Sequence, residues 1–164
     1  MSSGSQRPTT LAIAEVIDGD TVALTNGEHV RLVQIDTPEL REGECYASEA
    51  TRVLNRLLPA GTEVRLQPDE RLDRTDRYGR LLRYVYKGST NVNLALVERG
   101  AASVWFFDGD RGRYARQFVK AARAARRTPR GLWRECPGTS FDPAHGVDTT
   151  PAIGRSGRRI IDRR

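Results

Sequence analysis

Short runs of apolar residues, separated by turn residues, follow one another along the first half of the chain. Runs rich in Val, Ile, Leu and Thr predict strands, and Asn26 followed by Gly27 is a strong hairpin signal. The strand-like runs cover residues 9–17, 21–24, 30–35, 63–66 and 81–86. The pattern therefore predicts five strands, of which the first three are joined by short turns.

Three other segments have the period of a helix. Apolar residues recur at every third or fourth position in residues 47–58, 92–99 and 111–127. With the five strands, they predict an α+β fold that is mainly β, a five-stranded OB-type barrel with three packed helices. The third helix also carries a basic stripe opposite its apolar face, which is either a solvated face or a secondary contact with a nucleic-acid backbone.

The patterning is lost towards both ends of the chain. Residues 137–164 contain glycines and prolines without a hydrophobic period, which predicts a disordered, basic tail. Residues 1–8 are typical of a flexible lead-in and lack the apolar core of a signal peptide. We therefore expect one folded domain at residues 9–136.

The charge balance favours a polyanionic partner. The chain has 164 residues, with 27 Lys and Arg against 21 Asp and Glu, a net charge of +6 and a pI of about 9.9. Such a chain attracts nucleic acid through phosphate neutralisation, although ordinary solubility charge is the alternative explanation. No apolar run approaches the length of a membrane span, so no membrane partner is expected.

Two acidic motifs lie among the predicted strands. Residues 18–21 are Asp-Gly-Asp-Thr, and residues 36–39 are Asp-Thr-Pro-Glu. Each has an ordinary explanation by itself, because Asp-Gly is a common turn and the second motif is typical of a helix start. Residues 108–110 repeat Asp-Gly-Asp before the third helix, where we expect an aspartate to cap free N–H groups.

Together with two arginines, these motifs indicate a site. Carboxylates bind hard cations, and guanidinium groups such as those of Arg31 and Arg80 bind phosphate. Strand alternation places Arg31 and Asp36 on opposite faces, so they meet only if the strand bends or ends before Asp36. Arg80 has an alternative as well, since a carboxylate of its own loop could pair with it: Asp69, Glu70, Asp73 or Asp76.

The order of the motifs resembles that of the staphylococcal nuclease (thermonuclease) family. The matching segments are residues 16–21, residues 31–39 and residues 76–80, the last of which is Asp-Arg-Tyr-Gly-Arg. The resemblance extends over roughly residues 10–136. It implies an OB-type barrel and a Ca²⁺-dependent nuclease, acting as a monomer on DNA and RNA with little sugar specificity.

The resemblance also implies a role for each motif residue. Asp20, Asp36 and the Thr37 carbonyl would hold one Ca²⁺ ion, with Asp18 as a supporting acidic residue. Three further residues would be catalytic. Glu39 would orient or deprotonate the attacking water, and Arg31 and Arg80 would bind the scissile phosphate. Two rival functions stay open, a catalytically silent nucleic-acid-binding module and a phosphodiesterase for small nucleotides.

The chain departs from the family where well-known members carry two tyrosines that contact the nucleotide. Here that stretch contains Trp105 and Phe106, which could still stack on a base. We therefore regard Trp105 and Phe106 as possible nucleotide contacts, together with Arg77 and Tyr78.

The two cysteines are Cys45 and Cys136. With two histidines in the chain, a four-ligand zinc site is not expected. The resemblance implies a disulfide between the cysteines, and two buried thiols are the alternative. A disulfide requires an oxidising compartment, so we expect an extracytoplasmic protein if its N-terminus has been trimmed and a cytoplasmic one otherwise.

Overall fold

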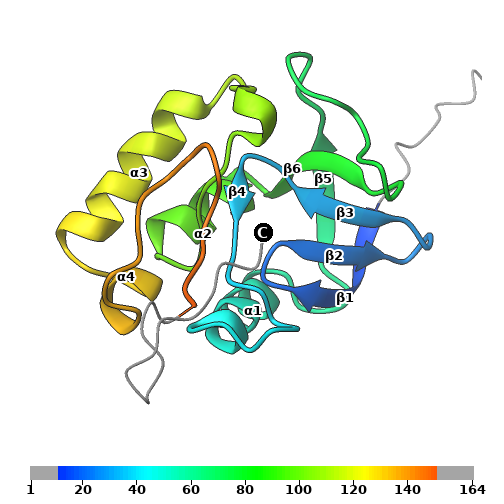
Figure 1. The fold of residues 1–164 in the computed structure, drawn as a ribbon. Helices are drawn as coiled ribbons and strands as arrows, with labels where there is room; N and C mark the ends of the chain where they lie inside the picture. The colour runs from blue at the N-terminus through cyan, green and yellow to red at the C-terminus, as the bar shows by residue number, and fades with distance from the viewer. Residues whose placement is uncertain (1–10, 151–164) are drawn as a thin grey trace, which may run out of the picture.

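Five strands close into a barrel in the computed structural model, which describes residues 11–150 (Figure 1). They are β1 (Leu11–Asp18), β2 (Thr21–Leu24), β3 (His29–Leu32), β5 (Glu63–Gln67) and β6 (Leu81–Lys87). Antiparallel pairs join β3, β2, β1, β5 and β6 in that order, and a parallel pair between β3 and β6 closes the ring. The predicted five-stranded OB-like barrel is confirmed.

Helices cover the barrel on one side and at one end. They are α1 (Ala47–Leu57), α2 (Val92–Glu98), α3 (Ala115–Arg127) and the short α4 (Leu132–Glu135). Figure 1 shows α1 below the barrel and α2 and α3 beside it. Leu54 of α1, Leu96 of α2 and Phe118 of α3 are fully buried in one core with the barrel residues Leu32 and Tyr84. Within residues 11–150, no helix is long and apolar enough to cross a membrane.

Three short strands and one 3₁₀ turn complete the fold within residues 11–150. A two-residue strand, β7 (Thr90–Asn91), extends the sheet beyond β6, and Asn91 Oδ1 caps α2 by accepting a hydrogen bond from Leu94 N (3.1 Å). A separate pair joins β4 (Ile35–Asp36) to β8 (Ser103–Val104). A 3₁₀ turn, η1 (Phe107–Gly109), precedes α3.

The start of α3 differs from the sequence-based expectation. The helix begins at Ala115, after Tyr114, and no side chain of residues 108–110 caps it. Side chains from other elements accept hydrogen bonds from the segment before the helix: Gln34 Oε1 from Gly112 N (2.7 Å) and Asp69 Oδ2 from Arg113 N (2.8 Å). A long-range contact thus satisfies N–H groups for which the sequence suggested a local cap.

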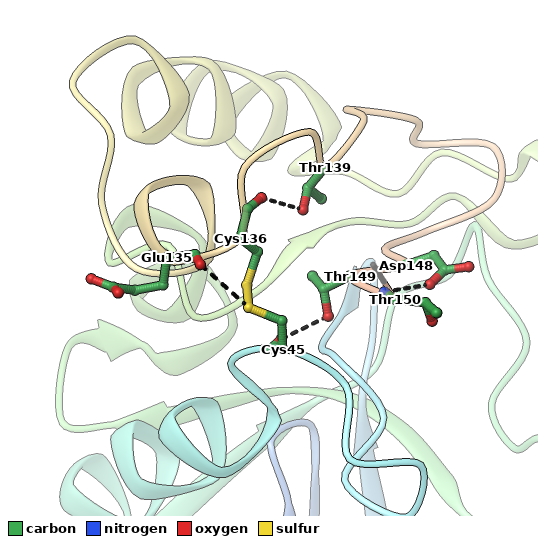
Figure 2. The surroundings of a disulfide bond; sticks show 7 residues. All are labelled: Cys45, Glu135, Cys136, Thr139, Asp148, Thr149 and Thr150. Atoms are coloured by element: carbon green, nitrogen blue, oxygen red, sulfur yellow. Dashed lines mark hydrogen bonds between the residues drawn. A yellow bond between two sulfur atoms is a disulfide. The ribbon is translucent and has the colours of Figure 1, made fainter. Parts of the chain in front are cut away.

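The predicted disulfide between Cys45 and Cys136 is confirmed (Figure 2). It joins the start of α1 to the end of α4 across 91 residues of sequence, with the Cα atoms 6.0 Å apart. In a chain-entropy description, a loop of this length contributes about 4–5 kcal/mol to the free energy of unfolding.

Residues 137–150, called the C-terminal segment below, also differ from the expectation of a disordered tail. Val147 is buried against Leu132 and Cys136. Thr149 Oγ1 donates to Cys45 O (2.6 Å), and Phe106 N donates to Pro143 O (2.7 Å). Specific bonds rather than a hydrophobic period hold this segment in place. The remainder of the predicted tail and the predicted lead-in at residues 1–8 lie outside the described residues.

We expect Asp69→Asn to destabilise the fold at neutral pH. The carboxylate is only 3% exposed and accepts hydrogen bonds from Tyr84 Oη (2.6 Å), Arg71 N and Arg113 N. Burial alone would raise the pKa of Asp69, but these bonds outweigh burial and lower it. The bonds therefore stabilise the fold above the unfolded pKa of about 3.9, and this stabilisation is lost as pH falls through the lower folded pKa.

Urea unfolding at pH 7 should show a loss of about 1.5–3 kcal/mol for Asp69→Asn, and a smaller loss near pH 3. Asp73→Asn, at an exposed position of the same loop, is the control and should stay within about 0.5 kcal/mol of wild type. Equal effects of the two substitutions would contradict the role given to Asp69.

Candidate active site

Arg31 is the centre of the candidate site. It lies on β3 and is 8% exposed. Its Nη2 atom is 3.3 Å from Asp20 Oδ2 and 3.4 Å from Asp36 Oδ1. Its Nη1 atom donates to the carbonyl oxygens of Leu32 and Ile35. One guanidinium thus brings together carboxylates from two different segments.

Asp36 reaches Arg31 because the strand ends before it. The predicted strand at residues 30–35 is divided into β3, which ends at Leu32, and β4, which begins at Ile35. Gln34 between them has a φ of 68°, in the left-handed region that non-glycine residues seldom adopt. Its side chain is held by Asp110 O, which accepts from Nε2 (3.1 Å), and by Gly112 N, which donates to Oε1 (2.7 Å). No local sequence signal marks this break.

Asp20 lies in the turn between β1 and β2 and is 6% exposed. Its Oδ2 atom accepts hydrogen bonds from Thr37 N (3.2 Å) and Thr37 Oγ1 (2.9 Å). Asp18 Oδ1 accepts from Asp20 N (3.0 Å). A Cβ atom at Gly19 would lie 2.7 Å from Thr37 Oγ1, so this close approach of the two acidic motifs requires glycine.

Negative charge exceeds positive charge in this cluster. Burial, together with repulsion from Asp20, raises the pKa of Asp18 to about 7. Burial also raises the pKa of Asp36 to about 7, although Arg31 opposes the shift and Asp20 and Glu39 add to it. Burial would lower the pKa of Arg31, but the surrounding carboxylates raise it. The cluster is therefore suited to an additional cation.

Arg80, directly before β6, approaches the same cluster at Thr21. Asp76 Oδ2 forms an ion pair with Arg80 Nε (2.7 Å), and Asp76 Oδ1 accepts from Tyr78 N and Arg80 N. Arg80 Nη1 donates to Thr21 Oγ1 (3.4 Å), next to Asp20. Of the four possible partners, the structure selects Asp76, which orients the second arginine.

Glu39 follows this cluster on an exposed loop. Its backbone N–H donates to Glu44 Oε1 (2.6 Å), and Glu44 Oε2 in turn accepts from Thr150 Oγ1 (3.0 Å). No motif in the sequence marks Glu44 or Thr150. Their link is visible only after the C-terminal segment has folded back.

A cleft of about 450 Å³ opens beside the two arginines. Among its lining residues are Arg77 and three aromatic side chains, Tyr78, Trp105 and Phe107. Arg31 lies over the Trp105 ring (5.7 Å) and Arg80 over the Tyr78 ring (5.4 Å).

Phe106 does not line the cleft, contrary to the sequence-based prediction. It is buried in the core and covered by Arg111, whose Cζ atom is 4.8 Å from the ring centroid. Phe107, which is 57% exposed, lines the cleft instead. Phe106 N donates to Pro143 O (2.7 Å), so a contact with the distant C-terminal segment holds this position.

Within residues 11–150, no group of three or more His, Cys, Asp or Glu side chains is arranged to hold a metal ion by itself. The donor set at the cluster nevertheless fits a hard cation, because every available ligand atom is an oxygen. Asp20 Oδ2 and Asp36 Oδ1 already converge on one positively charged atom, Arg31 Nη2. A bound cation there would need backbone carbonyl, water or substrate oxygens to complete its shell.

The sequence of the chain is similar to those of known proteins. The sequence profile of the staphylococcal nuclease homologue family matches residues 29–135. The thermonuclease of Staphylococcus hyicus is 30% identical over 131 residues, which is 76% of this chain and 75% of that protein. The match to the family profile therefore includes β3 to α4 and every lining residue of the cleft.

Two proteins of Bacillus subtilis (strain 168) are also similar. The SPbeta prophage-derived endonuclease YokF is 32% identical over 130 residues, and the endonuclease YncB is 30% identical over 139 residues. The aligned parts are 75% and 80% of this chain, but only 43% and 65% of those proteins, so the chain spans less than two thirds of each. From the profile match and these relatives we conclude that the chain belongs to the staphylococcal nuclease family.

Proposed function

We propose that this chain is a Ca²⁺-dependent nuclease that hydrolyses phosphodiester bonds of DNA and RNA with little sugar specificity. The observation that carries the proposal is that Asp20 and Asp36 both pair with Arg31, and that Arg31 lines one cleft together with Arg80. Membership of a nuclease family and the endonuclease and thermonuclease names of the relatives support it. We further propose that the domain acts as a monomer.

In this proposal, Asp20, Asp36 and the Thr37 carbonyl hold one Ca²⁺ ion. The ion supplies Lewis-acid stabilisation of the phosphate oxygens. Asp18 keeps the Asp20 backbone in place through its bond to Asp20 N. In the structure, Arg31 neutralises part of the charge of these carboxylates. With a cation bound to the aspartates, Arg31 would be available to bind the phosphate.

Arg31 and Arg80 bind the scissile phosphate and stabilise the charge that develops on its oxygens. Each charge-assisted hydrogen bond contributes about 1.5–3 kcal/mol. The ion pair with Asp76 restricts the Arg80 side chain, so less conformational entropy is lost when substrate binds.

Glu39 is proposed as the general base. Its exposed side chain is in contact with solvent, from which the attacking water comes. The carboxylate accepts a proton from this water as the water oxygen attacks phosphorus, and the bond to the leaving oxygen breaks. General-base assistance of this kind contributes about 10²–10⁴ in rate.

The aromatic wall of the cleft would accept bases without reading them. Tyr78, Trp105 and Phe107 can stack on any base, because every base has a π face. Arg77, which lines the cleft and lies 4.9 Å over the Tyr78 ring, would contact the backbone.

A basic groove on α3 supports a longer contact with nucleic acid. About 460 Å³ in volume, it is lined by Val119 and five cations: Arg111, Arg116, Lys120, Arg123 and Arg127. Within the part of the chain that the structure describes, none of these five forms an ion pair with a carboxylate. Arg111 directly follows Asp110, which lines the catalytic cleft. We propose that the nucleic-acid backbone leaves the cleft along this groove.

A catalytically silent nucleic-acid-binding module is the alternative. Such a module needs the arginines and the groove but not the carboxylates. The carboxylates are retained here and converge despite the cost of burying like charges together, which favours the enzyme.

Digestion of single-stranded DNA, duplex DNA and RNA should proceed with Ca²⁺ and stop with excess EGTA. Gel electrophoresis of the products is a sufficient readout. Digestion that continues in EGTA would refute the Ca²⁺ requirement. Binding without digestion under any metal condition would favour the silent module.

Glu39→Gln and Arg80→Ala should fold normally and lose most activity. We expect kcat to fall by about 10²–10⁴ for Glu39→Gln. Removing the guanidinium of Arg80 should cost at least about one to two orders of magnitude in kcat/KM. Glu70→Gln and Arg71→Ala, at exposed positions outside the cleft, are the matched controls. Wild-type rates for either test variant would remove its assigned role.

Lys120→Gln combined with Arg123→Gln should weaken binding to a long single-stranded oligonucleotide. For every phosphate that the variant no longer neutralises, the slope of log K against log salt should become shallower by about 0.7. Fluorescence anisotropy in EDTA measures this slope without cleavage. Arg52→Gln combined with Arg56→Gln on α1 removes the same charge elsewhere and is the control. Equal slopes for the two double variants would exclude the α3 groove as a binding surface.

A further inference from the structure

The C-terminal segment reaches the candidate metal-binding cluster at Asp36. Val147 N donates a hydrogen bond of 2.8 Å to Asp36 Oδ2, across 111 residues of sequence. The other oxygen of the same carboxylate, Oδ1, lies 3.4 Å from Arg31 Nη2. Each oxygen therefore has a different partner, and the backbone N–H determines which way the carboxylate is rotated.

Gly146 brings the segment unusually close to this carboxylate. Its φ is 83°, and a Cβ atom at this position would clash with Asp36 Oδ2 and press on the Asp36 side chain. Glycine is required here both by the backbone conformation and by the space. Gly138, in the same segment, has a φ of 85° but no atom within 4 Å of an added Cβ.

A second contact links the segment to the loop of the proposed general base. Thr150 Oγ1 donates to Glu44 Oε2 (3.0 Å), and Glu44 Oε1 accepts from Glu39 N (2.6 Å). Glu44 thus connects the C-terminal segment to the backbone of Glu39. Next to it, Thr149 Oγ1 donates to Cys45 O (2.6 Å), one residue beyond Glu44 (Figure 2).

Both ends of the segment are attached to the framework. Its first residue follows Cys136, which the disulfide ties to Cys45 (Figure 2). Midway, Pro143 O accepts from Phe106 N (2.7 Å), and Val147 packs against Leu132. Figure 1 shows the segment returning from α4 towards β4. It is held firmly enough to orient the side chains that it touches.

We propose that the C-terminal segment is a positioning element of the active site. Gly146 and Val147 orient Asp36 for cation binding, and Thr150, through Glu44, holds the loop that carries Glu39. This inference rests on the proposed function. Its residues act through Asp36 and Glu44, so they are positioning and not catalytic residues.

The test compares Gly146→Ala with Gly138→Ala by calorimetric titration with Ca²⁺ in the absence of nucleic acid. Both substitutions strain a glycine with nearly the same φ, but only Gly146→Ala disturbs Asp36. We expect Gly146→Ala to weaken Ca²⁺ binding by about 10–100-fold, as removal of a residue that orients a metal ligand does. Gly138→Ala should keep the wild-type affinity.

Equal Ca²⁺ affinities for the two alanine variants would overturn the inference while leaving the proposed function intact. A wild-type protein that binds no Ca²⁺ would overturn the metal assignment and, with it, this role of Gly146. The two failures are therefore distinguishable from the wild-type titration alone.

Milder variants test the second contact if Gly146→Ala does not fold. Thr150→Val removes the hydroxyl that bonds to Glu44. Thr139→Val, in the same segment, removes a hydroxyl that bonds to Cys136 O (2.7 Å) and not to Glu44. We expect Thr150→Val to lower kcat about fivefold, the equivalent of one hydrogen bond, with KM and Ca²⁺ affinity unchanged. A kcat equal to that of Thr139→Val would overturn the role of Thr150.

Discussion

The buried guanidinium of Arg31 is the interaction on which the arrangement of the site depends. A charge that is only 8% exposed must be paired and fully hydrogen-bonded, or the fold does not tolerate it. Asp20, Asp36 and the carbonyls of Leu32 and Ile35 meet this requirement together. Such a group contributes little net stability, but it specifies where the β1–β2 turn and β4 must lie.

Segments far apart in the chain complete the surroundings of this guanidinium. Gln34 ties the break after β3 to the segment before α3, and Asp69 and Tyr84 bond in the same region. On the opposite side, Val147 N donates to the second oxygen of Asp36. In the sequence, the site is visible as two short acidic motifs. In the fold, the barrel, the segment before α3 and the C-terminal segment hold it in place together.

Whether a sequence-based prediction agrees with the structure depends on how far apart in the chain the interacting residues lie. Strands and helices were predictable, because period-two and period-3.6 patterns are local and reflect burial. Three features were not predictable: the missing aspartate cap at residues 108–110, the buried position of Phe106 and the order in residues 137–150. Each of these depends on a partner more than thirty residues away, namely Asp69, Pro143 and Asp36.

The barrel, the helices, the nuclease family and the residue types that a phosphodiester site requires could all be predicted from the amino-acid sequence. These follow from local periodicity and from motifs whose order is specific. The meeting of Arg31 and Asp36 is visible only in the folded chain, because the strand ends at Leu32 and Gln34 turns the chain in a left-handed conformation. The contact of the C-terminal segment with the site is likewise visible only in the fold, because hydrogen bonds to Asp36 and Glu44 leave no periodic pattern in the sequence.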